Sequence, residues 1–430
     1  MKLLVKDAEL AGRKASLGIE DGEIVSVEAD PYATRPCPGE ADRVIDASGL
    51  HAFPSLRNGH THAAMTLFRG WGDDLPLMTW LQEHVWPAEE HMTAEDVYHG
   101  TRLALVEMIR SGTTHFNEMY WHVDRVARAV EELGLRAHLG AIFIDHGDPD
   151  TAEQWRENTL RLIEARDQLH TRLSLALAPH SIYTVSPENL EWLGELSREH
   201  GLPVHIHLSE TRNEVEECVE AHGVRPVRLL DEVGLLEADL IAAHGVHVDD
   251  EEMALLGQAG AAVVTNPTAN MKLAVGGIFD HDRAREAGVR VALGTDGAGS
   301  NNSLDMIEEM KVAALAQKHR AGDPRSLPAR EALALATTGG AEVFGPGSGR
   351  LEPGEPADLM LVDLSGAATR PGHDPVSDLV YAASGSCVHT TICDGRVLMH
   401  DRELEVADED EILREAERAG RALVERAGGG

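Results

Sequence analysis

The chain has 430 residues, and 73 acidic side chains against 38 basic ones give it a formal net charge of −35 at pH 7. A surface this anionic repels nucleic acid and acidic membranes, so neither is expected as a partner. The length suits one large domain with a smaller one attached. Hydrophobic residues make up 43% of the chain, which is enough for a large core.

Lysine is scarce, since only six of the basic residues are lysines and the rest are arginines. Counterions screen the self-repulsion of an acidic surface, so this composition predicts adaptation to high salt. The opening residues MKLLVKDAEL contain no long apolar stretch, and no run approaches about 18 apolar residues. The protein is therefore expected in the cytoplasm. The four cysteines form no C-x-x-C pair, which argues against a zinc ribbon or a thioredoxin motif.

Both ends of the chain show short strand-like runs separated by turns. The runs cover residues 2–6, 15–19 and 23–27 at one end, and 358–363, 390–392 and 396–399 at the other. We expect the two ends to pair into one small β-sandwich-like domain. Apolar residues at helical spacing over 409–427 predict a closing helix.

The middle of the chain alternates short apolar runs with amphipathic helical segments such as 94–110, 124–133, 187–200 and 249–258. Eight runs are predicted to be strands: 52–56, 113–116, 136–144, 173–178, 203–208, 240–243, 261–265 and 289–293. Eight alternating β and α units predict an α/β fold of the (β/α)8 TIM-barrel type. The predicted domains are residues 52–349 for the barrel, with 1–51 and 350–430 forming the composite β domain.

Active sites of such barrels lie at the carboxyl ends of the strands, and polar side chains follow five of the predicted strands. They are His60 and His62, His180, His207 with Glu210, His244, and Asp296. Side chains two apart along a strand share a face, so His60 and His62 are both expected to point into the barrel mouth. With His207 and Asp296 they make three imidazoles and one carboxylate. This set suits one divalent metal, zinc by preference or ferrous iron.

Three neighbouring side chains have more than one interpretation. Glu210 is expected to reach over the metal, although an acid before a helix is also typical of a solvated side chain. His244 is a fifth ligand, a group that holds the attacking water, or a buried neutral histidine. His205 shares a face with His207 by alternation, and its deeper position favours a packing role.

The residues resemble the amidohydrolase superfamily, in the branch of 5′-methylthioadenosine/S-adenosylhomocysteine deaminases and chlorohydrolase-like proteins. The similar segments cover nearly the whole chain: NGHTHAAMTLFRGWGDDLPLMTWL (58–81), VWPAEE (85–90), SGTTHFNEMY (111–120), APHSIYTVSPE (178–188), VHIHLSET (204–211), AAHGVHV (242–248), TNPTANMKLAVGG (265–277) and GTDGAGSNNSLDMIEEM (294–310).

The resemblance implies a hydrolytic deaminase that releases ammonia from a small purine-like substrate of the adenosine type. The implied metal ligands are His60, His62, His207 and Asp296. Glu210 is the implied acid/base, Asp296 accepts a proton from water, and His244 holds the attacking water. Glu89 would bind a ribose hydroxyl and His180 would contact the substrate. Relatives are commonly homo-oligomers, so assembly of several copies is compatible with the resemblance.

The chain departs from the family pattern after the third strand. Relatives that accept S-adenosylhomocysteine carry an arginine there, whereas this chain has AHLGAIFIDHGD (137–148), and Arg156 lies farther on. Ser55 stands where relatives have glycine, and Arg57, expected to point away from the mouth, stands where they have an apolar residue. An alternative function is therefore a deaminase or hydrolase of another aminated or halogenated heterocycle, such as aminodeoxyfutalosine, guanine, a pterin or a triazine. A non-catalytic scaffold is a third hypothesis, which the intact set of ligands and acid/base opposes.

Overall fold

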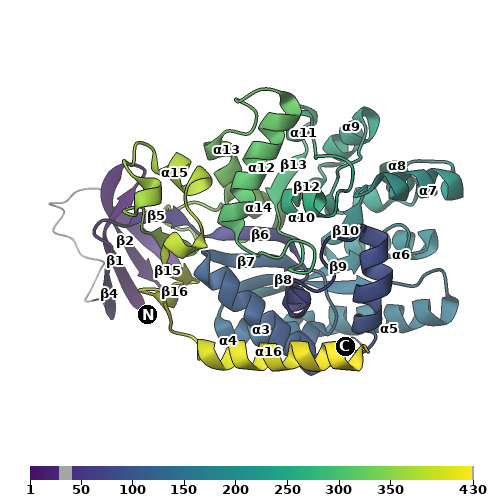
Figure 1. Cartoon of the computed structure of the whole chain (residues 1–430), viewed down its shortest axis with the longest axis horizontal. Helices are drawn as coiled ribbons and strands as arrows, with labels where there is room; N and C mark the ends of the chain where they lie inside the picture. The colour runs from purple at the N-terminus through teal and green to yellow at the C-terminus, as the bar shows by residue number, and fades with distance from the viewer. Residues whose placement is uncertain (29–40, 429–430) are drawn as a thin grey trace.

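The computed structural model describes residues 1–28 and 41–428, and the strands in this part of the chain form two sheets (Figure 1). The larger unit is an eight-stranded sheet whose strands stand in chain order and pair in parallel. Its strands are β6 (Leu56–Thr61), β7 (Thr113–Glu118), β8 (Arg136–Phe143), β9 (Leu173–Pro179), β10 (Val204–Leu208), β11 (Leu240–His244), β12 (Ala262–Thr265) and β13 (Arg290–Leu293).

The first and last strands of this sheet, β6 and β13, lie side by side and bring it nearly to closure. Just beyond β13, the backbone N–H of Asp296 donates to the carbonyl oxygen of His60 over 2.9 Å. The strands are buried along almost their whole length, because helices cover the outside and side chains fill the inside. The predicted (β/α)8 barrel is confirmed.

Helices connect the barrel strands and cover their outer face (Figure 1). Nearby side chains fix where two of these helices begin. Thr93 and Asp96 form a capping box at α3, and Asp249 and Glu252 form one at α9. The helices are α3 (Ala94–Arg110), α4 (Val123–Leu133), α5 (Pro149–Ala165), α6 (Pro187–His200), α7 (Arg212–His222), α8 (Pro226–Glu232), α9 (Asp250–Ala259), α10 (Pro267–Lys272), α11 (His281–Ala287), α12 (Met306–Ala321), α13 (Ala329–Leu335) and α14 (Thr338–Phe344).

The second sheet contains strands from both ends of the chain, as predicted, in the order β17-β16-β15-β14-β5-β1-β2-β3, with β4 beside β1. Its core is formed by small and branched apolar side chains of both ends, such as Leu17, Ile19 and Leu359. The strands are β1 (Lys2–Leu10), β2 (Arg13–Glu20), β3 (Glu23–Glu28), β4 (Arg43–Asp46), β5 (His51–Pro54), β14 (Leu359–Val362), β15 (Val388–Cys393), β16 (Arg396–His400) and β17 (Glu403–Leu404).

The position predicted for the first barrel strand, 52–56, is wrong. Residues His51–Pro54 form β5, which pairs antiparallel with β14 in the terminal sheet. The chain changes sheets at Ser55, whose N–H donates to the carbonyl of Asp358, while Leu56 N–H donates to Gly112 in the barrel. The apolar run ends at Leu56, whereas β6 continues through residues 57–60, which are not apolar but are buried, so the hydrophobic pattern does not mark this strand. His60 therefore lies within β6 and not after it. The domain limits at 51 and 349 stay a prediction.

The C-terminal segment forms the predicted closing helix, α16 (Glu409–Arg426). This helix runs along the outside of α3, far from the terminal sheet for much of its length (Figure 1). Arg110 of α3 donates two hydrogen bonds to Glu409, and Arg426 pairs with Asp96. The last helix therefore anchors the C-terminal part of the chain to the barrel. In the described residues, no helix is both long and apolar enough to cross a membrane.

Candidate active site

A cavity of about 790 Å³ opens at the carboxyl ends of the barrel strands. Its lining includes seven of the side chains singled out from the sequence: His62, Glu89, His180, His207, Glu210, His244 and Asp296. His60 is fully buried below them. The structure thus brings together residues that lie up to 236 positions apart, as expected if every strand contributes its carboxyl end to one mouth.

Asn58 fixes the seam between the first and last strands, directly below the site. Its side-chain amide donates to Thr295 Oγ1 over 2.6 Å, and its oxygen accepts from Thr295 N–H over 3.0 Å. Together with the backbone bond from Asp296 to His60, this pair sets the distance between the two strands that carry His60 and Asp296. The result is a fixed separation between an imidazole and a carboxylate.

The rings of His62 and His207 are held in defined tautomers. His62 Nδ1 lies 2.6 Å from the carbonyl oxygen of Met119, and His207 Nδ1 lies 2.7 Å from that of His180. A carbonyl only accepts, so both Nδ1 atoms carry a proton, and in the neutral rings both Nε2 atoms carry a lone pair. The two Nε2 atoms lie only 3.2 Å apart. Two lone pairs at this distance repel unless a cation or a proton lies between them.

This geometry fits a divalent metal. Two nitrogens that each bind a tetrahedral zinc at about 2.0–2.1 Å lie about 3.3 Å apart, close to the separation seen here. Asp296 Oδ1 lies 3.3 Å from His62 Nε2 and 3.5 Å from His60 Nε2, and His60 Nε2 is buried without a hydrogen-bond partner. Backbone carbonyls on the Nδ1 atoms are also the usual support of metal-binding histidines.

Asp296 is held as an anion. Burial alone would raise the pKa of its carboxyl group, but contacts with His60 and His62 lower this pKa well below the ordinary value. Asp296, His244 and Ser209 all adopt left-handed backbone angles, with φ of 65°, 73° and 49°. Residues other than glycine tolerate this conformation only where surrounding contacts enforce it, and such strain is common at functional sites.

His205, the alternative to His207, lies below the site. Its Nε2 is 3.0 Å from Nδ1 of His60, and its side chain is fully buried away from the cavity lining. His205 therefore supports the ring of His60 and leaves Nε2 of His60 directed toward Asp296. This placement agrees with the packing role expected from its depth in the strand.

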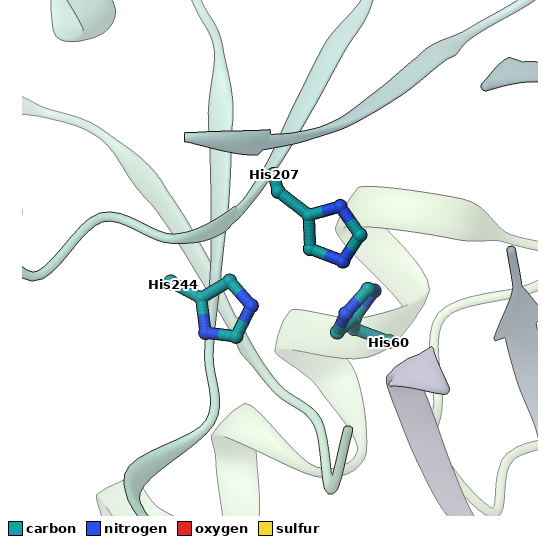
Figure 2. Close-up of side chains that lie close together, drawn as sticks. All are labelled: His60, His207 and His244. Atoms are coloured by element: carbon teal, nitrogen blue, oxygen red, sulfur yellow. The ribbon is translucent and has the colours of Figure 1, made fainter. Parts of the chain in front are cut away.

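Figure 2 shows His244 close to His60 and His207. Its hydrogen bonding differs from that of the other two. Its Nδ1 lies 2.9 Å from Nδ2 of Asn270, and an amide nitrogen can only donate. Burial lowers the pKa of His244, so the ring is neutral. With Nδ1 accepting, the proton of this ring is on Nε2. His244 is thereby arranged as a hydrogen-bond donor, which favours the water-holding role over a fifth ligand.

Glu210 is buried, so the interpretation as a solvated side chain before a helix is wrong. Burial, together with the charge of Asp296, raises its pKa to about 8. A second carboxylate, Glu214, holds the turn that carries it. Glu214 accepts from the backbone N–H groups of Ser209 over 2.7 Å and Glu210 over 2.8 Å. Glu210 is thus a proton-holding acid near neutral pH at a fixed place above the histidines.

The two side chains expected to contact substrate also have fixed orientations. Tyr120 donates from its hydroxyl to Glu89 over 2.8 Å, and burial raises the pKa of Glu89. His180 Nδ1 lies 2.9 Å from Thr184 Oγ1, which leaves the other ring nitrogen toward the cavity. Burial lowers the pKa of His180 to about 3, so its ring is neutral.

The unusual residues Ser55, Arg57 and Arg156 lie outside the cavity lining. Ser55 hydrogen-bonds Thr114 behind the barrel mouth. Arg57 is buried and donates to the carbonyls of Gly345 and Pro346 over 2.8 and 2.6 Å, so it points away from the mouth as predicted. Arg156 is directed toward α6 and hydrogen-bonds Asn189.

Comparison with known proteins agrees with this geometry. The pattern of the Amidohydrolase family matches residues 52–398. The chain belongs to the amidohydrolase family. A 5′-deoxyadenosine deaminase of Methanoregula boonei is 52% identical over 390 residues, covering 90% of this chain and 88% of the relative. A 5-methylthioadenosine/S-adenosylhomocysteine deaminase of Desulforudis audaxviator is 44% identical, covering 99% of this chain and 100% of the relative.

Solved structures place the fold in the same group. An adenosine deaminase from Xanthomonas campestris with bound zinc superposes with a TM-score of 0.92 at 36% identity, over 98% of both chains. A zinc complex of atrazine chlorohydrolase from Arthrobacter aurescens superposes with a TM-score of 0.88 at 23% identity, over 97% of this chain and 100% of that one, which supports the fold alone. The resemblance seen in the sequence motifs, to amidohydrolases of the deaminase branch, is confirmed.

Proposed function

We propose that the chain is a metal-dependent deaminase of adenosines modified at the 5′ position, converting the exocyclic amine to a carbonyl and releasing ammonia. The observation that carries the proposal is the pair of facing Nε2 atoms of His62 and His207, 3.2 Å apart, beside Asp296 and the buried acid Glu210. The relatives named as 5′-deoxyadenosine and methylthioadenosine/S-adenosylhomocysteine deaminases support this substrate class.

The ligands proposed for the metal are His60, His62, His207 and Asp296. Three nitrogens and one carboxylate favour zinc over iron, and the adenosine deaminase with bound zinc supports this choice. When bound, the metal supplies a water whose pKa is lowered toward about 7.

The protein groups then divide the proton transfers. Asp296 accepts a proton from the attacking water. Glu210, protonated near neutral pH, donates to a ring nitrogen beside the amine-bearing carbon and makes that carbon electrophilic. His244 donates from Nε2 to the attacking oxygen. The C–O bond forms first and gives a tetrahedral carbon that carries a hydroxyl and the amine. Asp296 then passes its proton to the amine, the C–N bond breaks and ammonia leaves. The remaining hydroxyl proton goes to Glu210 as the C=O bond forms.

Glu89 and His180 orient the substrate in this proposal. Glu89 accepts from a ribose hydroxyl, and its hydrogen bond from Tyr120 fixes the orientation of the carboxylate. His180 presents one ring nitrogen to the base or sugar from the opposite wall. Both contacts hold the amine-bearing carbon near Glu210 and raise the effective concentration of the reacting groups.

The decisive experiment measures ammonia release from a panel of amines by the metal-loaded protein. We expect turnover of 5′-deoxyadenosine and 5′-methylthioadenosine, with inosine-type products. The protein dialysed against a chelator should lose at least about 100-fold in activity and unfold at a lower temperature, and zinc should restore both. Turnover of guanine, a pterin or a triazine in place of the adenosines would reject the substrate class, and no turnover by the zinc-loaded protein would favour a scaffold.

A further inference from the structure

The outer half of the cavity differs in chemistry from the half that holds the histidines. Its walls are built from the rings of Trp121 and Trp155, whose centroids lie 5.6 Å apart, together with Ile144 and Leu162. The cavity volume of about 790 Å³ lies toward the upper end of the range for small-molecule sites. The wall that these four side chains form is therefore apolar and suits a chain attached to the nucleoside.

One cation lies in this outer half. Among the described residues that line the cavity, Arg161 on α5 is the only arginine or lysine. Its one hydrogen bond in the described structure goes to Asn158 Oδ1, a neutral amide, over 2.8 Å. Most arginines here pair with carboxylates, as expected in a chain of net charge −35. A guanidinium without a carboxylate partner, facing a cavity, is a ready binding group for an anion.

The rotation of α5 decides which of its arginines faces the cavity. Trp155, Asn158 and Leu162 lie three and four residues apart and line it together with Arg161. Arg156 lies on another face. Its Nε donates to Asn189 over 2.7 Å, and its guanidinium lies 5.2 Å from the ring of Trp192. Arg156 is therefore occupied elsewhere, and Arg161 alone can meet a ligand.

The cavity lining also holds exposed carboxylates. Asp124, in the first turn of α4, lines the cavity, and its side chain is 74% exposed. Its described ion pair is the long one to Arg125, at 3.5 Å. Glu90 is the other exposed acid of the lining, so Arg161 and Asp124 pair its one guanidinium with one of two exposed carboxylates. A free α-amino acid end, with its carboxylate and ammonium, is complementary to this pair.

We propose that Trp121, Trp155, Asp124 and Arg161 form a tail subsite, defined by these four residues, that binds a 5′ thioether chain ending in an α-amino acid. The two indoles contact the apolar part of the chain and its sulfur. Arg161 binds the carboxylate and Asp124 the ammonium. The inference rests on the proposed deaminase function and deepens it, because it makes S-adenosylhomocysteine a substrate although the stretch after β8 has no arginine.

The test compares Arg161→Gln with Arg156→Gln, a matched control on the same helix but outside the cavity. Ammonia release is measured for S-adenosylhomocysteine, 5′-methylthioadenosine and 5′-deoxyadenosine by the zinc-loaded full chain. Loss of a charge-assisted contact predicts that Arg161→Gln raises KM for S-adenosylhomocysteine about 10- to 100-fold with kcat nearly unchanged. The other two substrates should change less than about twofold. Arg156→Gln should change none of the three, and Arg161→Lys should restore part of the loss.

Three results would overturn the tail subsite while the deaminase proposal stands. One is an unchanged KM for S-adenosylhomocysteine in Arg161→Gln. Another is an equal loss for all three substrates, which indicates a general structural effect. The third is a wild-type protein that deaminates 5′-methylthioadenosine but not S-adenosylhomocysteine. Failure of the wild type on every adenosine would instead reject the proposed function. Asp124→Asn gives an independent check, since it should raise KM only for S-adenosylhomocysteine, the substrate that carries the ammonium.

Discussion

The two halves of the cavity are constrained to very different degrees. At the deep end, the rings of His62, His207 and His244 each have one nitrogen bonded to a backbone carbonyl or an amide, and Glu214 holds the turn of Glu210. At the outer end, two indoles and a guanidinium with one neutral partner line the wall. Fixed geometry suits the bond-making groups, whereas a loosely bonded apolar wall suits selection between substrates. Changes at the deep end should therefore act on kcat, and changes at the outer end on KM.

The largest effect is expected from Glu210→Gln. The amide is similar in size but has no acidic proton for the ring nitrogen, so kcat should fall at least about 1,000-fold. Metal content, measured by elemental analysis, should stay near one equivalent because Glu210 is not a proposed ligand. Retained turnover in this variant would remove Glu210 from the reaction. Loss of metal together with activity would show that the side chain acts on the metal site instead.

A second effect concerns stability and pH at Glu309, which supports the loop that follows Asp296. Glu309 accepts from Asn301 over 3.0 Å and from the backbone of Thr268 over 2.9 Å. Burial raises its pKa from 4.5 to about 7, so the folded state favours the protonated form. This preference adds on the order of 3 kcal/mol to the free energy of unfolding. The contribution is complete below about pH 4.5 and is lost as the pH rises through about 7.

The measurement is the free energy of unfolding of the wild type and Glu309→Gln at several pH values from 5.5 to 8. The Gln side chain does not titrate, so the difference between the two proteins should shift steadily in favour of the variant as the pH rises. A difference that stays constant across this range would contradict the raised pKa. Chemical unfolding at constant high salt keeps the repulsion of the acidic surface equal in both proteins.

The third effect tests how the deep end is held rigid. Glu214→Gln keeps one acceptor oxygen but places an NH2 group against one of the N–H groups of Ser209 and Glu210. The turn should shift and lower kcat about 10- to 100-fold, with KM changed much less. Because Glu214 acts only through Glu210, the double variant Glu210→Gln/Glu214→Gln should be no slower than Glu210→Gln. Additive losses in the double variant would give Glu214 a role of its own.

The metal end was largely predictable from sequence because its chemistry follows local periodicity. Alternation along a strand places His60 and His62 on one face, and the barrel type places His207, His244 and Asp296 at the same mouth. The junction at Ser55 is not predicted, because the apolar run ends at Leu56 while β6 continues to Thr61. The residues of β6 after Leu56 are buried without being apolar, so hydrophobicity does not identify this strand.

The supporting contacts were not predictable in this way. Asn270 meets His244 across 26 positions, and Tyr120 meets Glu89 across 31, so no local pattern pairs them. Glu214 is three residues after the capping residue Thr211, a spacing typical of a capping box, yet its carboxylate accepts from Ser209 and Glu210. Such partners depend on side-chain directions set by the packing of whole helices.

The smallest effect is expected from a substitution in the outer wall. It distinguishes the contribution of an aromatic contact from that of buried apolar surface. Trp155→Leu keeps an apolar side chain but removes the indole that faces Trp121. A sulfur–aromatic contact contributes about 0.3–1.5 kcal/mol, so kcat/KM for 5′-methylthioadenosine should fall about fivefold through KM. For 5′-deoxyadenosine, which has no sulfur, the change should stay within about twofold. Trp192→Leu is the matched control, because Trp192 packs on Phe143 outside the cavity lining. An equal loss for both substrates, or a loss in kcat, would show that the outer wall is coupled to the deep end.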